Sequence, residues 1–330
     1  IIVSIMLAVL MDNRQPAKTI AWVMVLLFMP IVGIILYVFF GRNTRKMTFI
    51  SQRSLDQLSK RSMLEFVEQR QLTLPDDYRS LIQLFTNQSL PLPFKDNEGE
   101  FYNDGYEFFP ALLKSIASAR KHIHLETYIF ADDALGRLVA DALISKSKEG
   151  VEVRLIYDDV GCWRVPRSLF ERMRRAGVDV NAFMPVKFPA FTSKVNYRNH
   201  RKVCIVDGVE AFVGGMNIAL RYVKGLYGGQ LPWRDTHVRI RGGAVYALQR
   251  TFLVDWYFVD RTLGPNSKYY PPMPWRIENS CLMQVVTSSP IAKWPDIMQG
   301  YVRILLEAKN YVYMASPYFL TTGQVLCAMR

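Results

Sequence analysis

The hydrophobic and polar positions divide the chain into an apolar beginning, a polar connector and a long region of alternating patterns. Residues 1–11 (IIVSIMLAVLM) are apolar but fall short of the ~20 residues that a membrane-spanning helix needs. Residues 20–40 carry no charge, and their one proline, Pro30, is tolerated in membrane helices. This pattern predicts a membrane anchor over 1–41, with a truncated first helix at 1–11 and a transmembrane helix at 20–40.

Basic residues on either side of the transmembrane helix predict its orientation, because the flank richer in lysine and arginine stays in the cytoplasm. Arg14 and Lys18 precede the helix. Four basic residues follow it, at positions 42, 45, 46 and 53. We therefore expect a multi-pass membrane protein whose part after the anchor is cytoplasmic.

A polar connector, residues 42–100, precedes the region in which strand and helix patterns alternate. Its own helical pattern (LDQLSKRSMLEFVEQ) is followed by a proline-rich exit (LPLP). From residue 101 onward, helical periodicity at 106–119 and 135–147 alternates with apolar strands at 121–130 and 151–157. Alternation of this kind is typical of an α/β fold in which helices flank a mixed sheet.

Further strands complete a first lobe over residues 101–263. They are predicted at 202–206, 211–213 and 237–240, and Asp207-Gly208 is a hairpin-turn signal between the first two. A proline-rich linker follows at 264–280.

A weak internal repeat then suggests a second lobe. Residues 308–319 repeat the order of residues 119–130: a helix ending in alanine and a basic residue, then a strand, then an aromatic exit. We expect 281–330 to begin a second, pseudo-symmetric lobe. Because the chain starts inside one apolar run and stops inside a helical pattern, we expect a fragment at both ends.

The densest polar cluster is residues 196–217, NYRNHRKVCIVDGVEAFVGGMN. His200 and Lys202 are two residues apart, so on a strand they share a face. A neutral imidazole can attack phosphorus, and an ammonium, an amide and backbone N–H groups can stabilise the charge of the transition state. Asp207 could orient a neighbouring side chain. The alternative is an ordinary hairpin with a surface histidine and lysine.

The spacing of this cluster resembles the HKD motif of the phospholipase D superfamily: H-x-K, four residues, D, six residues, G-G-x-N. Within that superfamily the chain is similar to the bacterial cardiolipin synthases. The segments that carry this similarity are NRQPAKTIAW (13–22), FGRN (40–43), IHLETYIF (123–130), NYRNHRK (196–202), VGGMNI (213–218), WRDTHVRIRG (233–242) and SPYF (316–319).

The resemblance implies roles for individual residues. His200 is expected to be the nucleophile, Lys202 and Asn217 to bind phosphate, and Asp207 to be the orienting carboxylate. Gly215, where many phospholipases and nucleases carry serine, is usual in these synthases and is expected beside the phosphate. Which histidine of the family's two motifs attacks stays open.

The family's fold joins two lobes, each contributing one HKD motif to a shared site. Only one H-x-K occurs in these 330 residues. We expect the second motif beyond Arg330, and we expect the chain alone to be inactive.

Other polar positions are weaker candidates. Glu126 shares one strand face with His124 and Tyr128, and we expect it among the phosphate-binding residues, against the alternative of an outward-facing polar side chain. Residues 233–237 (WRDTH) could line a lipid entrance, although His237 fits a structural histidine better. Basic and aromatic residues over 187–198 favour a membrane interface over nucleic acid.

Composition narrows the partner and the chemistry. The net charge of +12 suits an anionic partner. Four cysteines without a CxxC pair, and no HExxH, favour neither a disulfide scaffold nor a local metal site. We expect no metal and no cofactor. Oligomeric state is left open.

The resemblance favours a cardiolipin synthase of the bacterial inner membrane. It would transfer a phosphatidyl group from one phosphatidylglycerol to another through a phosphohistidine and release glycerol. Alternatives are a phospholipase D, another phosphatidyltransferase, a membrane-anchored nuclease, or a non-catalytic membrane scaffold.

Overall fold

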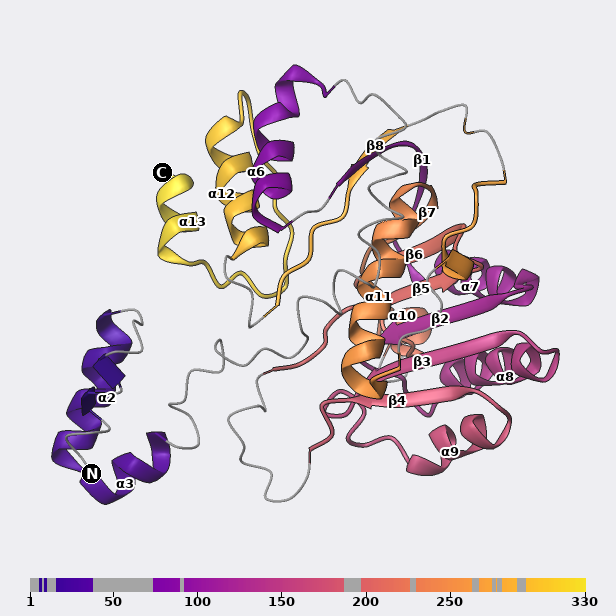
Figure 1. The fold of residues 1–330 in the computed structure, drawn as a ribbon, viewed down its shortest axis with the longest axis horizontal. Coiled ribbons are helices and arrows are strands. Elements are labelled where there is room, and N and C mark those ends of the chain that lie inside the picture. Colours follow the sequence, from indigo (N-terminus) through magenta and orange to yellow (C-terminus); the bar gives the residue numbers. More distant parts are fainter. Residues whose placement is uncertain are drawn as a thin grey trace.

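A mixed sheet of eight strands, in the order β4-β3-β2-β5-β6-β7-β1-β8, dominates the part of the chain that the structure describes (Figure 1). The structure is a computed structural model. It describes residues 6–7, 9–10, 16–37, 74–89, 92–186, 197–225, 230–262, 267–274, 277, 281–289 and 295–330.

The strands are β1 (Pro93–Tyr102), β2 (His122–Thr127), β3 (Glu152–Asp158), β4 (Asp179–Phe183), β5 (Val203–Val206), β6 (Glu210–Gly214), β7 (His237–Gly242) and β8 (Cys281–Gln284). The helices are α2 (Pro16–Phe28), α3 (Pro30–Leu36), α6 (Arg79–Ser89), α7 (Gly105–Ser118), α8 (Ala134–Lys148), α9 (Arg167–Arg175), α10 (Arg221–Lys224), α11 (Ala244–Asp260), α12 (Asp296–Glu307) and α13 (Gly323–Ala328), with short 3₁₀ turns η3 (Asp76–Tyr78) and η4 (Ser267–Tyr269).

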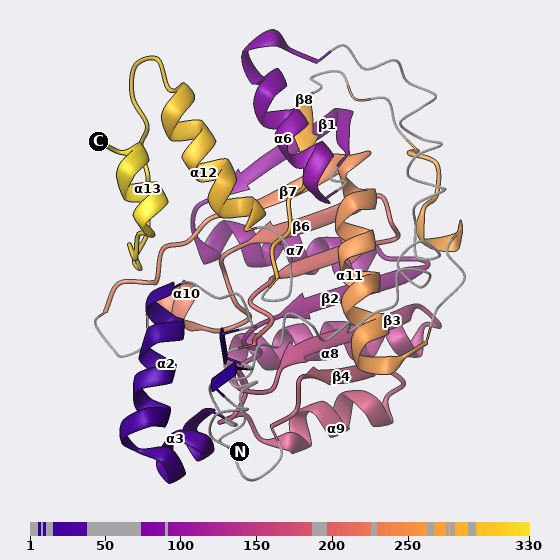
Figure 2. The same cartoon turned by 60° about the vertical axis from the view of Figure 1, so that its left-hand side comes forward.

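The predicted α/β lobe is confirmed. Strands β2, β3 and β4 are parallel, joined by crossovers through α8 and α9, whereas β5, β6, β7, β1 and β8 pair antiparallel. Helices α7, α8 and α9 cover one face of the sheet, and α11 crosses the other (Figure 2). The helices and strands expected between residues 106 and 240 all form, with ends shifted by a few residues.

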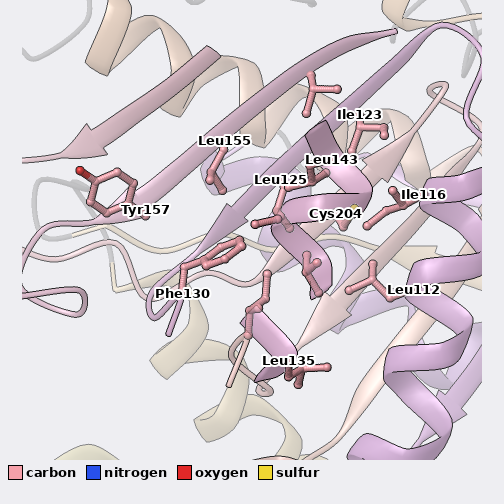
Figure 3. Close-up of a cluster of buried hydrophobic side chains, with 14 of the residues drawn as sticks. Leu112, Ile116, Ile123, Leu125, Phe130, Leu135, Leu143, Leu155, Tyr157 and Cys204 are labelled. Carbon is pink, nitrogen blue, oxygen red and sulfur yellow. The ribbon is translucent and has the colours of Figure 1, made fainter. Parts of the chain in front are cut away.

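Strand β2 lies near the middle of the sheet and is buried along its whole length. Ile123 and Leu125 point into the apolar cluster beneath α7 and α8, together with Leu143 and Leu155 (Figure 3). The alternate residues of β2 face α11 instead, where His124 stacks on Phe252. The period of two that the sequence shows therefore sends apolar residues to one face and polar ones to the other.

The N-terminal apolar region differs from the single helix expected at 20–40. Helix α2 ends at Phe28, and α3 begins at Pro30, because a proline lacks the N–H for a continuous helix and its ring crowds the preceding turn. The two helices pack together: a Cβ on Gly33 would lie 2.9 Å from the Val25 carbonyl oxygen. Of the helices described, none is both long and apolar enough to cross a membrane.

Two expected boundaries shift. Strand β1 begins at Pro93 and extends the sheet into the expected connector, with a polar, exposed stretch that hides its strand character. Strand β8 pairs with β1, so residues 281–284 join the sheet of the first lobe rather than a second one. The helical pattern before residue 74 lies outside the described residues.

The expected repeat of helix, strand and helix is confirmed only for the helices α12 and α13. Residues 308–322 contain no strand, contrary to expectation. The aromatic side chains there, such as Tyr313 and Tyr318, are exposed. A strand needs a neighbouring strand for its hydrogen bonds, and in the described residues this segment pairs with none.

Candidate functional site

The candidate site lies where residues 198–202 enter β5, at the carboxyl ends of β2 and β3. This segment forms no regular secondary structure and β5 begins only at Val203, so His200 and Lys202 precede the strand rather than lying on it as expected. The Asp158 carboxylate, at the end of β3, accepts a hydrogen bond from the Asn199 backbone N–H at 3.0 Å. Ligand sites of α/β sheets commonly form at such edges.

His200 and Lys202 lie together, as predicted. The Lys202 Nζ is 3.2 Å from the His200 Nδ1 and donates to the His200 carbonyl oxygen at 2.7 Å. The Tyr128 ring packs against the imidazole with centroids 4.6 Å apart. His200 is exposed, whereas Lys202 retains only 4% of its accessible surface.

The protonation of this pair suits phosphoryl chemistry. Partial burial, and then the charge of Lys202, lower the pKa of His200 below its usual value. The imidazole is therefore largely neutral at pH 7 and keeps a lone pair. Burial lowers the pKa of Lys202 to about 8, so the ammonium persists at pH 7.

Glu126 lies behind this pair, not beside it. Its side chain is buried on the α11 face and accepts a hydrogen bond from the Asn199 amide, which also reaches the Asp255 carboxylate at 3.3 Å. Arg201 forms an ion pair with Asp255. Burial, and then the charge of Asp255, raise the pKa of Glu126 well above its usual value. Glu126 thus braces the segment carrying His200, in surroundings that favour the protonated form of its carboxyl group.

Asp207 is not brought to the site. It follows β5, at the end opposite His200, in the turn with Gly208 that the sequence predicts. Its carboxylate accepts backbone hydrogen bonds from Arg120, Lys121 and His122, at 2.7–3.0 Å. These bonds fasten the β5–β6 turn to the start of β2. The geometry offers no contact with His200 for an orienting role.

Asn217, which follows β6, links the segment after β2 to helix α10. Its side-chain oxygen accepts from the Ile129 N–H at 3.0 Å, and its amide donates to the Tyr222 hydroxyl at 2.9 Å. The carbonyl of the amide is therefore engaged in the fold. One amide hydrogen remains for another partner.

Gly215 makes room for Asp235. A Cβ at position 215 would overlap the Asp235 carboxylate, so the glycine lets that carboxylate lie against the backbone. Asp235 acts electrostatically on both site residues, raising the pKa of His200 and of Lys202 against the larger effect of burial. The sequence placed Asp235 at a lipid entrance and did not assign it this position.

Three residues that neighbour the His200 and Lys202 pair were not predicted to do so from the sequence: Tyr128, Asp158 and Asp235. Tyr128 shares the period of Glu126, and Asp158 ends a buried strand, so both carried a signal. His237 is structural, as the sequence favoured: its Nδ1 accepts from the Met216 N–H at 3.2 Å and its ring stacks on Phe108. The basic and aromatic stretch at 187–196 lies outside the described residues.

Comparison with known proteins now decides the family. A family model described as "Cardiolipin synthase, PLD-like domain" matches residues 112–227, and one described as "Phospholipase_D-nuclease N-terminal" matches residues 1–42. The chain is 37% identical over 331 residues to the cardiolipin synthase of Oceanobacillus iheyensis, covering 98% of this chain and 68% of that protein. It is 35% identical over 343 residues to the major cardiolipin synthase of Bacillus subtilis, covering 100% of this chain and 70% of that protein.

The chain belongs to the cardiolipin synthase family. The resemblance inferred from the sequence is thereby confirmed, and with it a phospholipase D-like, phosphatidyltransferase type of domain. The chain is also 36% identical over 341 residues to the cardiolipin synthase of Alkalihalophilus pseudofirmus, covering 100% of this chain and 66% of that protein. It thus spans about two thirds of the length of these relatives.

Likeness to solved structures is weaker. NucT from Helicobacter pylori aligns with 49% of this chain and 98% of its own, at 17% identity and a TM-score of 0.40. The family assignment rests on the sequence matches.

Proposed function

We propose that this chain carries the nucleophilic half-site of a cardiolipin synthase. The observation that supports this most directly is the pair at the sheet edge: an exposed, largely neutral His200 next to the desolvated ammonium of Lys202. A neutral nucleophile beside a fixed positive charge is what attack on an anionic phosphodiester requires.

The reaction proceeds by two displacements at phosphorus. A nitrogen of His200 attacks the phosphorus of phosphatidylglycerol, the P–N bond forms, and the P–O bond to glycerol breaks. A general acid, which the family resemblance assigns to a second HKD histidine, protonates the departing glycerol. The hydroxyl of a second phosphatidylglycerol then passes its proton to the group that protonated glycerol, which now acts as a base, and the oxygen attacks phosphorus. The P–N bond breaks, cardiolipin leaves, and no nucleotide is consumed.

Lys202 stabilises charge on the non-bridging oxygens in both displacements. Loss of one such group typically costs about 3–4 kcal/mol of transition-state stabilisation. The remaining amide hydrogen of Asn217 and the backbone beside Gly215 are the other phosphate contacts that we propose.

Two residues receive roles that differ from the sequence expectation. Glu126 is proposed as a positioning residue that holds Asn199, rather than as a phosphate ligand. Asp235 replaces Asp207 as the carboxylate that orients the His200 and Lys202 pair, because Asp235 lies on the same side of the sheet edge and Asp207 does not.

We also propose that the N-terminal region associates with the bacterial inner membrane and that the lobe is cytoplasmic. Exposed apolar side chains along α2 and α3 support this, among them Ile20, Leu27, Phe28 and Ile31. The match of residues 1–42 to the N-terminal family model supports it too. The division into anchor, connector, first lobe, linker and second lobe belongs to the same proposal, with strands β1 and β8 now counted in the first lobe.

The test expresses the gene read through to its natural stop, so that the expected second HKD motif is included, in membranes supplied with phosphatidylglycerol. Lipids and free glycerol are measured by mass spectrometry. His200→Ala is the test variant, and Lys121→Ala, an exposed residue at the opposite edge of the sheet, is the control. Cardiolipin and glycerol formed by the control and lost in His200→Ala support the proposal. Phosphatidic acid alone indicates that water is the acceptor. Cardiolipin that survives His200→Ala refutes the nucleophile, and no product at all refutes the substrate.

A further inference from the structure

Two loops at the site edge present large apolar and basic side chains to solvent. The first follows β3 and exposes Trp163, with 65% of its surface accessible. The second precedes β7 and exposes Leu231, at 87%, and Trp233, at 42%. His237 of β7 pairs with Gly214 of β6, so the second loop reaches the same edge of the sheet as His200.

Arginines accompany these apolar side chains. Arg164 and Arg167 are exposed beside Trp163, and Arg234 is exposed beside Trp233. Among the residues described, none of the three forms an ion pair with a carboxylate, unlike Arg172 and Arg175 further along α9, which pair with Asp141 and Glu171. We call the six side chains the rim: Trp163, Arg164, Arg167, Leu231, Trp233 and Arg234.

The first loop is firmly built. The Asp158 carboxylate accepts from the N–H groups of Val160 and Gly161, at 2.9 and 3.0 Å. A Cβ on Gly161 would overlap the Tyr128 carbonyl, and Tyr128 in turn packs on His200. The exposure of Trp163 is thus held by a rigid turn that touches the site.

The second loop is also held in place. The Trp233 N–H donates to the Arg221 carbonyl at 2.9 Å, and the Arg221 guanidinium lies 4.7 Å from the Trp233 ring centroid. Leaving an anchored tryptophan and a leucine in water costs free energy that contact with an apolar phase would recover.

We propose that the rim is a docking surface for the interfacial region of an anionic bilayer. Tryptophan is enriched at membrane interfaces, and arginine near an anionic surface adds attraction. A groove that binds single-stranded nucleic acid would instead be a basic channel with aromatic side chains placed along it to stack on successive bases. Docking here would lay His200 at the lipid headgroups, so the inference deepens the proposed function and names where its substrate is met.

The test reads local insertion rather than total binding, because the N-terminal helices can hold the chain on vesicles by themselves. A polarity-sensitive fluorophore is attached at Leu231→Cys in the full chain, with Cys281→Ser and Cys327→Ser removing the exposed thiols. Vesicles contain phosphatidylcholine with or without phosphatidylglycerol, and a nitroxide lipid serves as quencher. The same fluorophore at Lys121→Cys, at the opposite edge of the sheet, is the positional control.

We expect blue-shifted emission and quenching at position 231 in phosphatidylglycerol vesicles, and neither at position 121. Arg164→Gln with Arg167→Gln should weaken this docking about five-fold for each arginine. Arg172→Gln with Arg175→Gln, which removes the same charge, should not.

Equal signals at positions 231 and 121, or equal losses in the two arginine pairs, would overturn the proposal. A blue shift at position 231 that a single-stranded oligonucleotide produces in the absence of vesicles would overturn it as well. None of these readouts requires turnover, so a failure of the proposed function would be seen separately in the lipid products.

Discussion

The two ends of β5 carry the three residues of one motif in opposite environments. At the beginning, Lys202 is stripped of water and His200 is exposed beside it. At the far end, the Asp207 carboxylate is saturated by three backbone N–H groups. We call the beginning of β5, with His200 and Lys202, the chemical end, because these side chains remain available to a ligand. We call the turn with Asp207 the structural end, because backbone N–H groups occupy its carboxylate.

The chemical end is supported from behind by a buried acidic pair, and this is where the largest effect is expected. Asp255→Asn removes the partner of Arg201 and leaves a largely buried guanidinium unpaired, which should lower the free energy of unfolding by about 3 kcal/mol or more. Glu126→Gln should cost less than about 1 kcal/mol, because the raised pKa of Glu126 makes the amide a close mimic of the protonated acid.

Urea unfolding of the two variants measures this contrast. Turnover should fall with Asp255→Asn even at temperatures where the variant stays folded, because Arg201 flanks both His200 and Lys202. The reverse ranking, with Glu126→Gln the more damaging, would mean that Glu126 is ionised and the pairing has been assigned to the wrong acid.

The structural end should respond in stability alone. Asp207→Ala removes the acceptor of three backbone hydrogen bonds, and we expect a loss of about 2–3 kcal/mol in the free energy of unfolding. Asp207→Asn keeps one acceptor oxygen and the tolerance for positive φ, so it should lose about half as much.

Activity per folded molecule separates this role from a catalytic one. It should be unchanged in both Asp207 variants once the folded fraction is accounted for. A drop of a hundred-fold or more in a fully folded Asp207→Asn would return this carboxylate to the reaction.

Acid should weaken the structural end first. His122, whose backbone holds Asp207, is buried against Gln249, and burial lowers the pKa of His122 to about 4. In the unfolded chain His122 has an ordinary pKa near 6.5. Between pH 6.5 and 4 this residue is therefore protonated in the unfolded chain and neutral in the folded one. Stability should therefore fall as pH falls through this window, by roughly 2 kcal/mol at pH 5 from this residue.

Urea unfolding at pH 7.5 and pH 5 checks this dependence. His122→Gln should flatten it, although His124, whose pKa burial lowers to about 3, leaves part of the slope. A slope that His122→Gln leaves untouched would place the acid sensitivity elsewhere.

Local periodicity was enough to predict most helices and strands of the lobe. It failed where the pairing of a strand depends on residues far away in the sequence. The strands and helices around β2 and β3 followed from apolar runs and helical spacing, because their partners are close in sequence. Strand β8 was assigned to another lobe because its pairing with β1 joins residues 184 positions apart, as between Asn97 and Cys281.

The same limit applies to the site. Spacing placed His200 beside Lys202, because two residues only two positions apart in the sequence stay close whatever the rest of the chain does. It could not show that Asp207, five residues beyond Lys202, points to the other edge, nor that Asp235 fills the space over Gly215. Those facts depend on where separate strands end.

The smallest effect, and the one that best separates the chemical end from general stability, is the alkaline limb of the activity. The pKa of Lys202, lowered to about 8 by burial, means that half the ammonium is lost at pH 8. Turnover under kcat/KM conditions should halve there and fall about ten-fold for each further pH unit. The contribution of Lys202 to the free energy of unfolding should rise with pH between about 8 and 10.4. In that range the unfolded lysine holds its proton and the folded one has lost it, so raising the pH favours the folded state. Lys202→Arg, which does not titrate in this range, should be slower but lack the limb. An alkaline limb of unchanged position in Lys202→Arg would assign it to another group, and a parallel loss of activity and stability would mean that unfolding, not Lys202, ends the reaction.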